Sequence, residues 1–203
     1  YLDYKYKVEF EKDEYDFIDK YCKQKPLDWS TSVWDLDSLD FAIKYDLPFI
    51  KIPSAMVTNY ELVKASAQTG IPIIMSTGMS TLKEIDEAVE LLEKHAKSYA
   101  IMHCNSSYPT KNEEINLNVI PMLKERYNCT VGYSGHEYDL EPTVLAVVLG
   151  AKIIERHITI SHEMWGTDQK ASLEVHAMDL LKKRIQDIDT ILGDGAKIVT
   201  KNE

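Results

Sequence analysis

Segments with the pattern of buried strands alternate with amphipathic segments of helical period along most of the chain. The predicted strands cover residues 28–33, 48–53, 71–77, 99–104, 130–134 and 152–158. The predicted helices cover residues 11–24, 36–45, 58–69, 81–95, 114–126, 140–149 and 175–192. Because strands joined through helices pair in parallel with right-handed crossovers, this alternation predicts an α/β fold with a parallel sheet.

Helix start and stop signals agree with these boundaries. Asp35 and Thr58 precede two predicted helices, and Thr81 is followed three residues later by Glu84, which is the spacing of a capping box. Gly70 stands where a helix C-cap is expected.

Polar residues near the carboxyl ends of the strands help to choose between an open doubly wound sheet and a (β/α)8 barrel. Strands of a parallel sheet are covered on both faces and are normally almost wholly apolar. Here polar side chains occur near the end of every predicted strand: Thr31, Lys51, Ser54, Ser76, Thr77, His103, Asn105, Ser134, His136, Glu155 and His157. All strand ends meet at one mouth in a barrel, whereas an open sheet gathers them mainly at one switch point. The pattern favours a TIM barrel, and a whole one needs about 250 residues, so we expect it to be incomplete.

Lys51 is the one charged residue inside the apolar run FIKIP. Strand alternation places Ile50 and Ile52 on one face and Lys51 on the other, which would point into the barrel. The alternative is a lysine whose ammonium group reaches solvent from the strand end. Serine hydroxyls near the same mouth, with this lysine, suit a phosphate group. Neither a P-loop nor a GxGxxG motif is present.

Two consecutive strands end in histidine, in GYSGH (132–136) and IIERH (153–157). Alternation places Glu155 and His157 on one face of their strand and Arg156 on the other. Two imidazoles from neighbouring strands can bind one divalent ion with waters completing the shell, an open arrangement typical of Lewis-acid sites. The alternative is that each histidine is a hydrogen-bonded strand-end residue.

Composition narrows the class of partner. The net charge of −10 argues against general binding to nucleic acid or to a membrane surface. The apolar runs are too short to span a bilayer. Three cysteines without a CxxC pair indicate reduced thiols and a cytoplasmic location. The chain begins at Tyr1 in mid-pattern, so we expect it to be part of a longer protein.

Six motifs, in order, resemble the sialic acid synthase (N-acetylneuraminate synthase) family: KIPSA, MSTGMST, HCNSSYPT, GYSGHE, GAKIIERHIT and WGTDQKASLE. The resemblance runs from about residue 25 to about residue 192. It implies a TIM barrel that condenses phosphoenolpyruvate with an N-acetylated hexosamine, typically N-acetylmannosamine, and releases phosphate. It also implies a divalent metal, Mn²⁺ or Mg²⁺.

The resemblance implies a role for each matching residue. His136 and His157 would ligate the metal, and Glu155 would be the acid/base group. Phosphoenolpyruvate would be held by strand-end residues, namely Lys51, Ser54, Ser76, Ser134 and, as a weaker addition, Thr31. Tyr108 and Asp168 would contact the sugar. Met56 is a departure, because some members carry a charged residue at that place, and this leaves the sugar unassigned among N-acetylmannosamine, its 6-phosphate and diacetamido sugars.

The resemblance also implies how the chain is divided. Residues 1–192 would form a barrel domain of about six βα units without the first two strands, and residues 193–203 would begin a linker to an antifreeze-like domain. We expect the longer protein to be a homodimer and this chain alone to have low activity. Two alternatives stay open: an aromatic-pathway type of phosphoenolpyruvate synthase that uses a sugar phosphate, and a non-catalytic domain that binds metal or partners.

Overall fold

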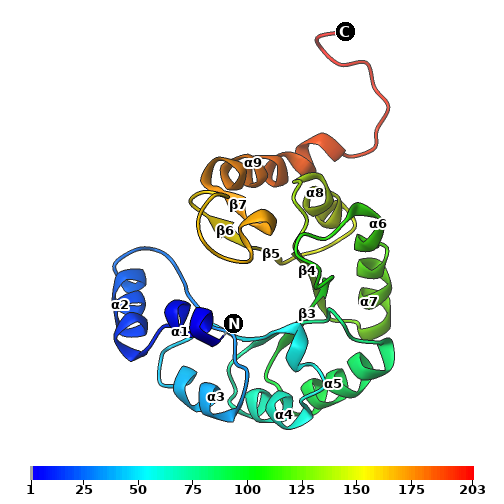
Figure 1. Ribbon diagram of the computed structural model, residues 1–203. Coiled ribbons are helices and arrows are strands. Elements are labelled where there is room, and N and C mark those ends of the chain that lie inside the picture. Colours follow the sequence, from blue (N-terminus) through cyan, green and yellow to red (C-terminus); the bar gives the residue numbers. More distant parts are fainter. Residues whose placement is uncertain (1) are drawn as a thin grey trace.

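A curved parallel sheet lies inside an arc of helices in the computed structural model, which describes the backbone of residues 2–203 and the side chains of residues 5–203 (Figure 1). The sheet has the strand order β1-β2-β3-β4-β5, so each strand pairs with its neighbour in the chain. Its strands are β1 (Ile50–Ile52), β2 (Ile73–Ser76), β3 (Tyr99–Cys104), β4 (Thr130–Gly135) and β5 (Ile154–Arg156). This α/β architecture is that of an incomplete TIM barrel, and the number of βα units stays a prediction.

The described helices are α1 (Leu2–Val8), α2 (Lys12–Lys23), α3 (Leu36–Ala42), α4 (Tyr60–Gln68), α5 (Leu82–His95), α6 (Asn112–Ile115), α7 (Val119–Tyr127), α8 (Glu141–Val148) and α9 (Val175–Leu192). Most of them lie along the outside of the curve, whereas α1 lies within it (Figure 1). Short 3₁₀ turns lie at Ser54–Met56 and Gln169–Ala171, and a second small sheet joins β6 (Ile158–Thr159) to β7 (Leu173–Glu174). No helix in the described part of the chain is long and apolar enough to cross a membrane.

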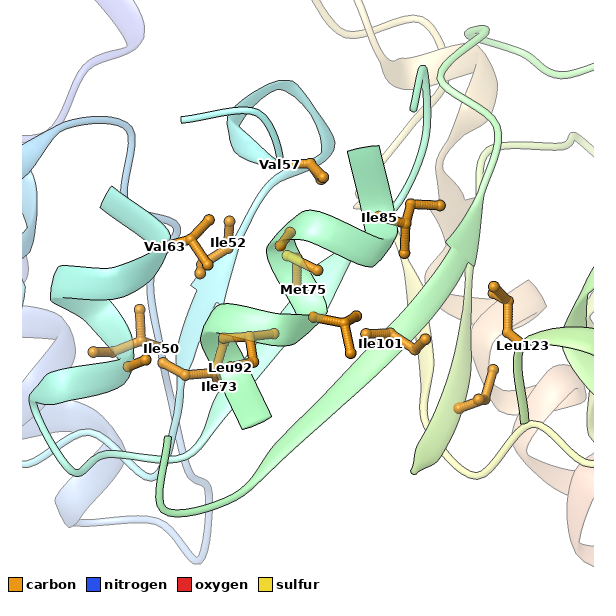
Figure 2. Close-up of a cluster of buried hydrophobic side chains, with 14 of the residues drawn as sticks. Ile50, Ile52, Val57, Val63, Ile73, Met75, Ile85, Leu92, Ile101 and Leu123 are labelled. Atoms are coloured by element: carbon orange, nitrogen blue, oxygen red, sulfur yellow. The ribbon is translucent and has the colours of Figure 1, made fainter. Parts of the chain in front are cut away.

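The core fills the space between the sheet and its helices. Alternate strand residues face outward into this layer, and Figure 2 shows Ile52 and Ile73 from the strands beside Val63 of α4 and Leu92 of α5. These four side chains are almost completely buried. Their burial holds the strands in register, so that the intervening residues, which face inward, are presented toward the inside of the curve.

Two predicted strands differ in the structure. The segment at 28–33 forms only an isolated parallel bridge between Ser32 and Lys51, because β1 itself is three residues long and offers few partners. The predicted strand at 152–158 divides in two: β5 pairs with β4, and β6 leaves the sheet to pair with β7.

Helix boundaries follow the expected caps with two corrections. Asp35 and Thr81 cap α3 and α5, each with a capping box, as predicted. Asn59, not Thr58, caps α4, because the Asn59 side chain accepts the Leu62 N–H at 3.2 Å. The predicted helix at 114–126 is interrupted at Asn116, whose φ of 49° is left-handed and ends α6.

Candidate active site

The carboxyl ends of the strands border an open cleft of about 460 Å³. All of the site residues expected from the sequence line it except Thr31: Lys51, Ser54, Ser76, Tyr108, Ser134, His136, Glu155, His157 and Asp168. They come from β1, β2, β4, β5 and the segments that follow the strands. The sheet therefore gathers on one surface residues that are far apart in the chain.

Lys51 faces this cleft, as alternation within β1 predicts. Its side chain is buried, its Nζ donates to Ser76 Oγ at 2.8 Å, and Nζ lies 3.4 Å from Glu155 Oε2. A buried ammonium group needs such partners, because an unpaired charge away from water is costly. Ser134 Oγ donates to the other oxygen of the same carboxylate at 2.8 Å. Glu155 thus occupies the place at which Lys51 and Ser134 could hold an anionic substrate.

Gly78 brings further polar groups to this part of the cleft. Its backbone N–H donates to Ser54 Oγ at 3.0 Å. A Cβ at Gly78 would lie only 2.3 Å from Ser106 Oγ and 2.9 Å from Ser54 Oγ, so a side chain there would displace both hydroxyls. The two hydroxyls line the same cleft as the buried Lys51, and such a combination of hydroxyls and positive charge suits phosphate oxygens.

The tautomer of His136 is set by its surroundings. Its Nδ1 lies 2.6 Å from the Asn105 carbonyl oxygen, which can only accept, so Nδ1 carries the hydrogen. In the neutral ring Nε2 then carries the lone pair that a metal ion needs. Burial opposes protonation, but hydrogen bonds with Cys104 and Asn105 outweigh burial and raise the pKa of His136.

Cys104 lies beside His136, with 3.9 Å between its Sγ and Nδ1 of the ring. Burial alone would raise the pKa of the Cys104 thiol. Hydrogen bonds with His136, Ser54 and Ser134 outweigh burial and hold this pKa below its ordinary value.

His157 and Tyr108 complete an aromatic group around His136. The His136 and His157 ring centroids are 5.2 Å apart, and the Tyr108 ring lies 4.1 Å from the first and 5.5 Å from the second. Burial, followed by the charge of His136, lowers the pKa of His157. His157 Nδ1 is 3.8 Å from Asp168 Oδ2. Desolvation raises the pKa of Tyr108 to about 12, so its phenol stays protonated at neutral pH.

The donor set is compatible with a weakly coordinated divalent ion. Among the described residues, no group of three or more His, Cys, Asp or Glu side chains is arranged to hold a metal. His136 and His157 alone would therefore supply two nitrogen ligands, and water or substrate oxygens would supply the rest. Such an open shell is typical of catalytic rather than structural ions.

Thr31 and Met56 lie outside the cleft. The Thr31 hydroxyl is 3.4 Å from the Tyr15 hydroxyl, and the neighbouring Ser32 lines the cleft instead. Backbone alternation explains this, because Ser32 and Thr31 point in opposite directions. Met56 packs against the hydrophobic core.

Eight residues that line the cleft were not predicted as site residues from the sequence: Lys5, Ser32, Trp34, Pro53, Ala55, Met79, Cys104 and Ser106. Strand alternation could have found Cys104, which follows Met102 by two residues on the inward face of β3. Ser106 lies beyond the strand end, where alternation no longer applies.

Comparison with known proteins identifies the family of the chain. The profile of the NeuB family matches residues 1–197. The chain belongs to the NeuB family. It is 38% identical over 187 residues to the N-acetylneuraminate-9-phosphate synthase of Drosophila melanogaster, covering 91% of this chain and 50% of the relative. It is 36% identical over 186 residues to the N,N'-diacetyllegionaminic acid synthase of Campylobacter jejuni, covering 90% and 56%. The chain spans about half the length of these curated relatives.

Solved structures show the same relationship. The N-acetylneuraminic acid (sialic acid) synthetase of Leptospira borgpetersenii, in complex with citrate, is 31% identical with a TM-score of 0.88, covering 96% of this chain and 68% of that one. A phospho-2-dehydro-3-deoxyheptonate aldolase of Thermotoga maritima is 15% identical with a TM-score of 0.74, covering 87% and 55%, and shows a likeness of fold alone.

Proposed function

We propose that the protein condenses phosphoenolpyruvate with an N-acetylated hexosamine to give a sialic acid or a related nonulosonate, releasing phosphate. One observation carries the proposal: a NeuB-family chain brings a buried lysine with serine hydroxyls and a pair of imidazoles to the same cleft. The lysine and the hydroxyls suit the phosphate of phosphoenolpyruvate, and the pair of imidazoles suits a metal ion that binds oxygens of the hexosamine. The relatives support this reading, since they are named as N-acetylneuraminate-9-phosphate and N,N'-diacetyllegionaminic acid synthases.

Phosphoenolpyruvate binds in this proposal beside Lys51, Ser54, Ser76 and Ser134. Lys51 supplies a positive charge that is already desolvated and held by Ser76. Phosphate oxygens would take the place that Glu155 occupies next to Lys51. This exchange frees the Glu155 carboxylate for chemistry in the same cleft.

The sugar binds on the opposite side, near His136, His157 and Asp168. When bound there, a divalent cation such as Mn²⁺ or Mg²⁺ supplies Lewis-acid polarisation of the sugar aldehyde oxygen. The Tyr108 ring packs against His136 at 4.1 Å and meets His157 edge-on at 5.5 Å, so it borders the place of the sugar. Asp168 would accept a hydrogen bond from a sugar hydroxyl.

The reaction makes one carbon–carbon bond and a carbon–oxygen bond to water, and it breaks the carbon–oxygen bond to phosphate. The methylene carbon of phosphoenolpyruvate attacks the aldehyde carbon, whose oxygen takes a proton from solvent water and becomes a hydroxyl. Water adds to the resulting cationic carbon as Glu155 accepts its proton, and loss of phosphate then leaves a ketone. Holding both substrates in attack geometry contributes much of the acceleration.

Several finer expectations belong to the same proposal. They are the cytoplasmic location, the homodimer of the longer protein, the division at residues 192 and 193, and the low activity of the 203-residue chain alone. The sugar also stays open, because the named relatives make different nonulosonic acids.

Phosphate release from phosphoenolpyruvate in the presence of Mn²⁺ tests the proposal. The panel contains N-acetylmannosamine, its 6-phosphate, a diacetamido hexose, and an aldose phosphate that lacks the acetamido group. We expect release with at least one acetamido sugar and none with the plain aldose phosphate. Since turnover by this chain is expected to be low, calorimetric binding of phosphoenolpyruvate accompanies the assay. Release only with the plain aldose phosphate would favour the aromatic-pathway alternative, and binding of metal without phosphoenolpyruvate would favour a non-catalytic domain.

A further inference from the structure

A buried ion pair lies directly behind the two histidines of the cleft. Arg156 and Glu137 are on the outward face, where NH1 of the guanidinium donates to Glu137 Oε1 at 3.0 Å. Both side chains are only 1% exposed. Glu137 follows His136 in the chain and Arg156 precedes His157, so the pair joins the backbone immediately beside both imidazoles.

Further hydrogen bonds hold both members of the pair. The Glu137 carboxylate accepts from the Tyr133 hydroxyl at 2.8 Å and from the Thr143 hydroxyl at 2.7 Å. Arg156 donates to Thr143 Oγ1 at 2.9 Å and to the carbonyl oxygen of Glu137 itself. The network therefore ties β4 to β5 and to the first turn of α8, which follows β4 (Figure 1).

The sheet itself does not extend to the histidines. The ladder between β4 and β5 ends with the pair Gly135 and Arg156, one residue before His136 and His157. Beyond that point β6 turns away to pair with β7. The side-chain network thus continues the connection between β4 and β5 where their backbone ladder stops.

Gly135 is matched to this arrangement. A Cβ at Gly135 would lie 2.5 Å from Glu137 Oε2 and 2.7 Å from a ring carbon of Tyr133. Only a residue without a side chain leaves room for the Glu137 carboxylate to fold back against the strand end. The backbone before His136 is shaped to admit the ion pair.

Stability alone is a poor explanation for such a pair. Removing two charges from water costs several kcal/mol per ion, and apolar replacement of a buried pair is often neutral or stabilising. A better-attested use of a buried polar network is to fix one arrangement of the chain. This network lies next to His136 and His157, so the arrangement that it can fix is the spacing of these two residues.

We propose that Glu137 and Arg156 are positioning residues that fix the distance and orientation between His136 and His157. The inference concerns the geometry of the two rings. Its metal readout rests on the proposed function, whereas its spectroscopic readout does not. Partners that orient metal-binding histidines typically affect metal affinity by about 10- to 100-fold, although they do not touch the ion.

The test uses variants that keep or remove the charges together. In the double variant Glu137→Gln/Arg156→Met no charge is left unpaired, so it is expected to fold. Arg156→Lys keeps the charge without the forked hydrogen bonds. Arg126→Met is the matched control, because Arg126 pairs with Asp86 between the outer helices α7 and α5.

Three measurements are made on each variant: Mn²⁺ affinity by electron paramagnetic resonance, phosphoenolpyruvate affinity by calorimetry, and histidine ring signals by NMR. We expect the double variant to lose about tenfold in Mn²⁺ affinity and to shift the signals of both rings, with phosphoenolpyruvate affinity unchanged. Arg156→Lys, which keeps the charge, should lose less Mn²⁺ affinity than the double variant. Arg126→Met lowers the melting temperature without changing Mn²⁺ affinity.

Parent-like Mn²⁺ affinity and unchanged ring signals in a folded double variant would overturn the positioning role. If the double variant does not fold, Arg156→Lys decides on the same two readouts. If the parent itself does not bind Mn²⁺, the metal part of the proposed function is wrong. The ring signals of the apo protein then still decide whether Glu137 and Arg156 hold the two histidines.

Discussion

The two sides of the cleft are built in different ways. On the side of β1 and β2, Lys51 and Ser76 are buried to 8% and 2% exposure and are held by a direct hydrogen bond. On the side of β5 and the loop that follows it, the side chains of Glu155, His157 and Asp168 are 40%, 35% and 47% exposed. One side is formed before any ligand arrives, whereas the other keeps contact with water.

The difference in burial determines which ligands each side of the cleft can bind. A charge that is already desolvated interacts strongly with an incoming anion, because the local dielectric is low and no water has to be displaced from the lysine. A partly hydrated group can exchange protons and bind ions whose shells include water. The buried side is therefore suited to holding an anion such as phosphate, and the exposed side to the chemistry that we propose at the sugar.

Glu155 links the two sides, and its substitution should produce the largest effect. Glu155→Gln removes the carboxylate that we propose as the acid/base group, so we expect turnover to fall by about 10²- to 10⁴-fold, as is typical for such groups. Mn²⁺ affinity should be retained, because the two imidazoles are unchanged. Phosphoenolpyruvate affinity should not fall, since the carboxylate that faces Lys51 is neutralised. Phosphate release and calorimetry measure these quantities, and parent-like turnover in Glu155→Gln would exclude the assigned role.

Lys51→Met removes the positive charge from the buried side of the cleft. Loss of a charge-assisted hydrogen bond costs about 1.5–3 kcal/mol, so phosphoenolpyruvate affinity should fall by about 10- to 100-fold. Mn²⁺ affinity should change little, because Lys51 does not contact either imidazole in the described structure. Calorimetry with each ligand separates the two effects.

Lys64→Met is the matched control, since Lys64 is exposed on α4. We expect it to bind phosphoenolpyruvate like the parent. Equal affinities in Lys51→Met and Lys64→Met would show that the buried lysine does not hold the anion.

Strand alternation in the sequence predicts the position of some cleft residues but not of others. Alternation within FIKIP places Lys51 in the cleft, because the adjacent isoleucines must face the helices. The same argument places Glu155 and His157 together and Arg156 opposite, as the structure confirms. Thr31 lies outside the cleft, because its segment makes only one bridge with β1, at Ser32, and this pairing was not predicted by the strand pattern.

The rest depends on contacts that local patterns do not encode. Glu137 lies beyond the end of β4, and its burial arises only because Arg156 and Thr143 meet it from other elements. Asp168 was inferred only from resemblance, because it reaches His157 through an irregular loop. Strand periodicity predicts directions within strands, whereas tertiary packing decides where side chains beyond the strand ends point.

The histidine pair tests whether the buried and exposed sides both contribute to metal binding. His136→Ala and His157→Ala should each lower Mn²⁺ affinity by at least about tenfold, the loss that even an indirect partner of a ligand can cause. We expect the larger loss for His136→Ala, because this ring is buried and its tautomer is fixed by Asn105. Electron paramagnetic resonance titration provides the affinities.

His95→Ala is the control for these two variants, because His95 lies in the last turn of α5, away from the cleft. It should bind Mn²⁺ like the parent. If His136→Ala and His157→Ala also did so, the two histidines would be hydrogen-bonded strand-end residues, which is the simpler interpretation of the sequence.

Tyr108 should give the smallest effect, and its two variants separate ring from hydroxyl. The ring contacts the buried His136 and the more exposed His157, so it joins the two sides by packing. Tyr108→Phe keeps these contacts and removes one hydroxyl, which should raise the KM for the sugar by about 2- to 10-fold, the value of a neutral hydrogen bond. Because the pKa of Tyr108 is raised to about 12, its phenol is protonated throughout the working range, and the pH profiles of Tyr108→Phe and the parent should coincide up to about pH 10. Tyr108→Ala, which removes the ring, should weaken both sugar and Mn²⁺ binding by more than Tyr108→Phe. If Tyr108→Phe instead lost a limb of the pH–rate profile, Tyr108 would take part in proton transfer, and the assignment of acid/base chemistry to Glu155 alone would be wrong.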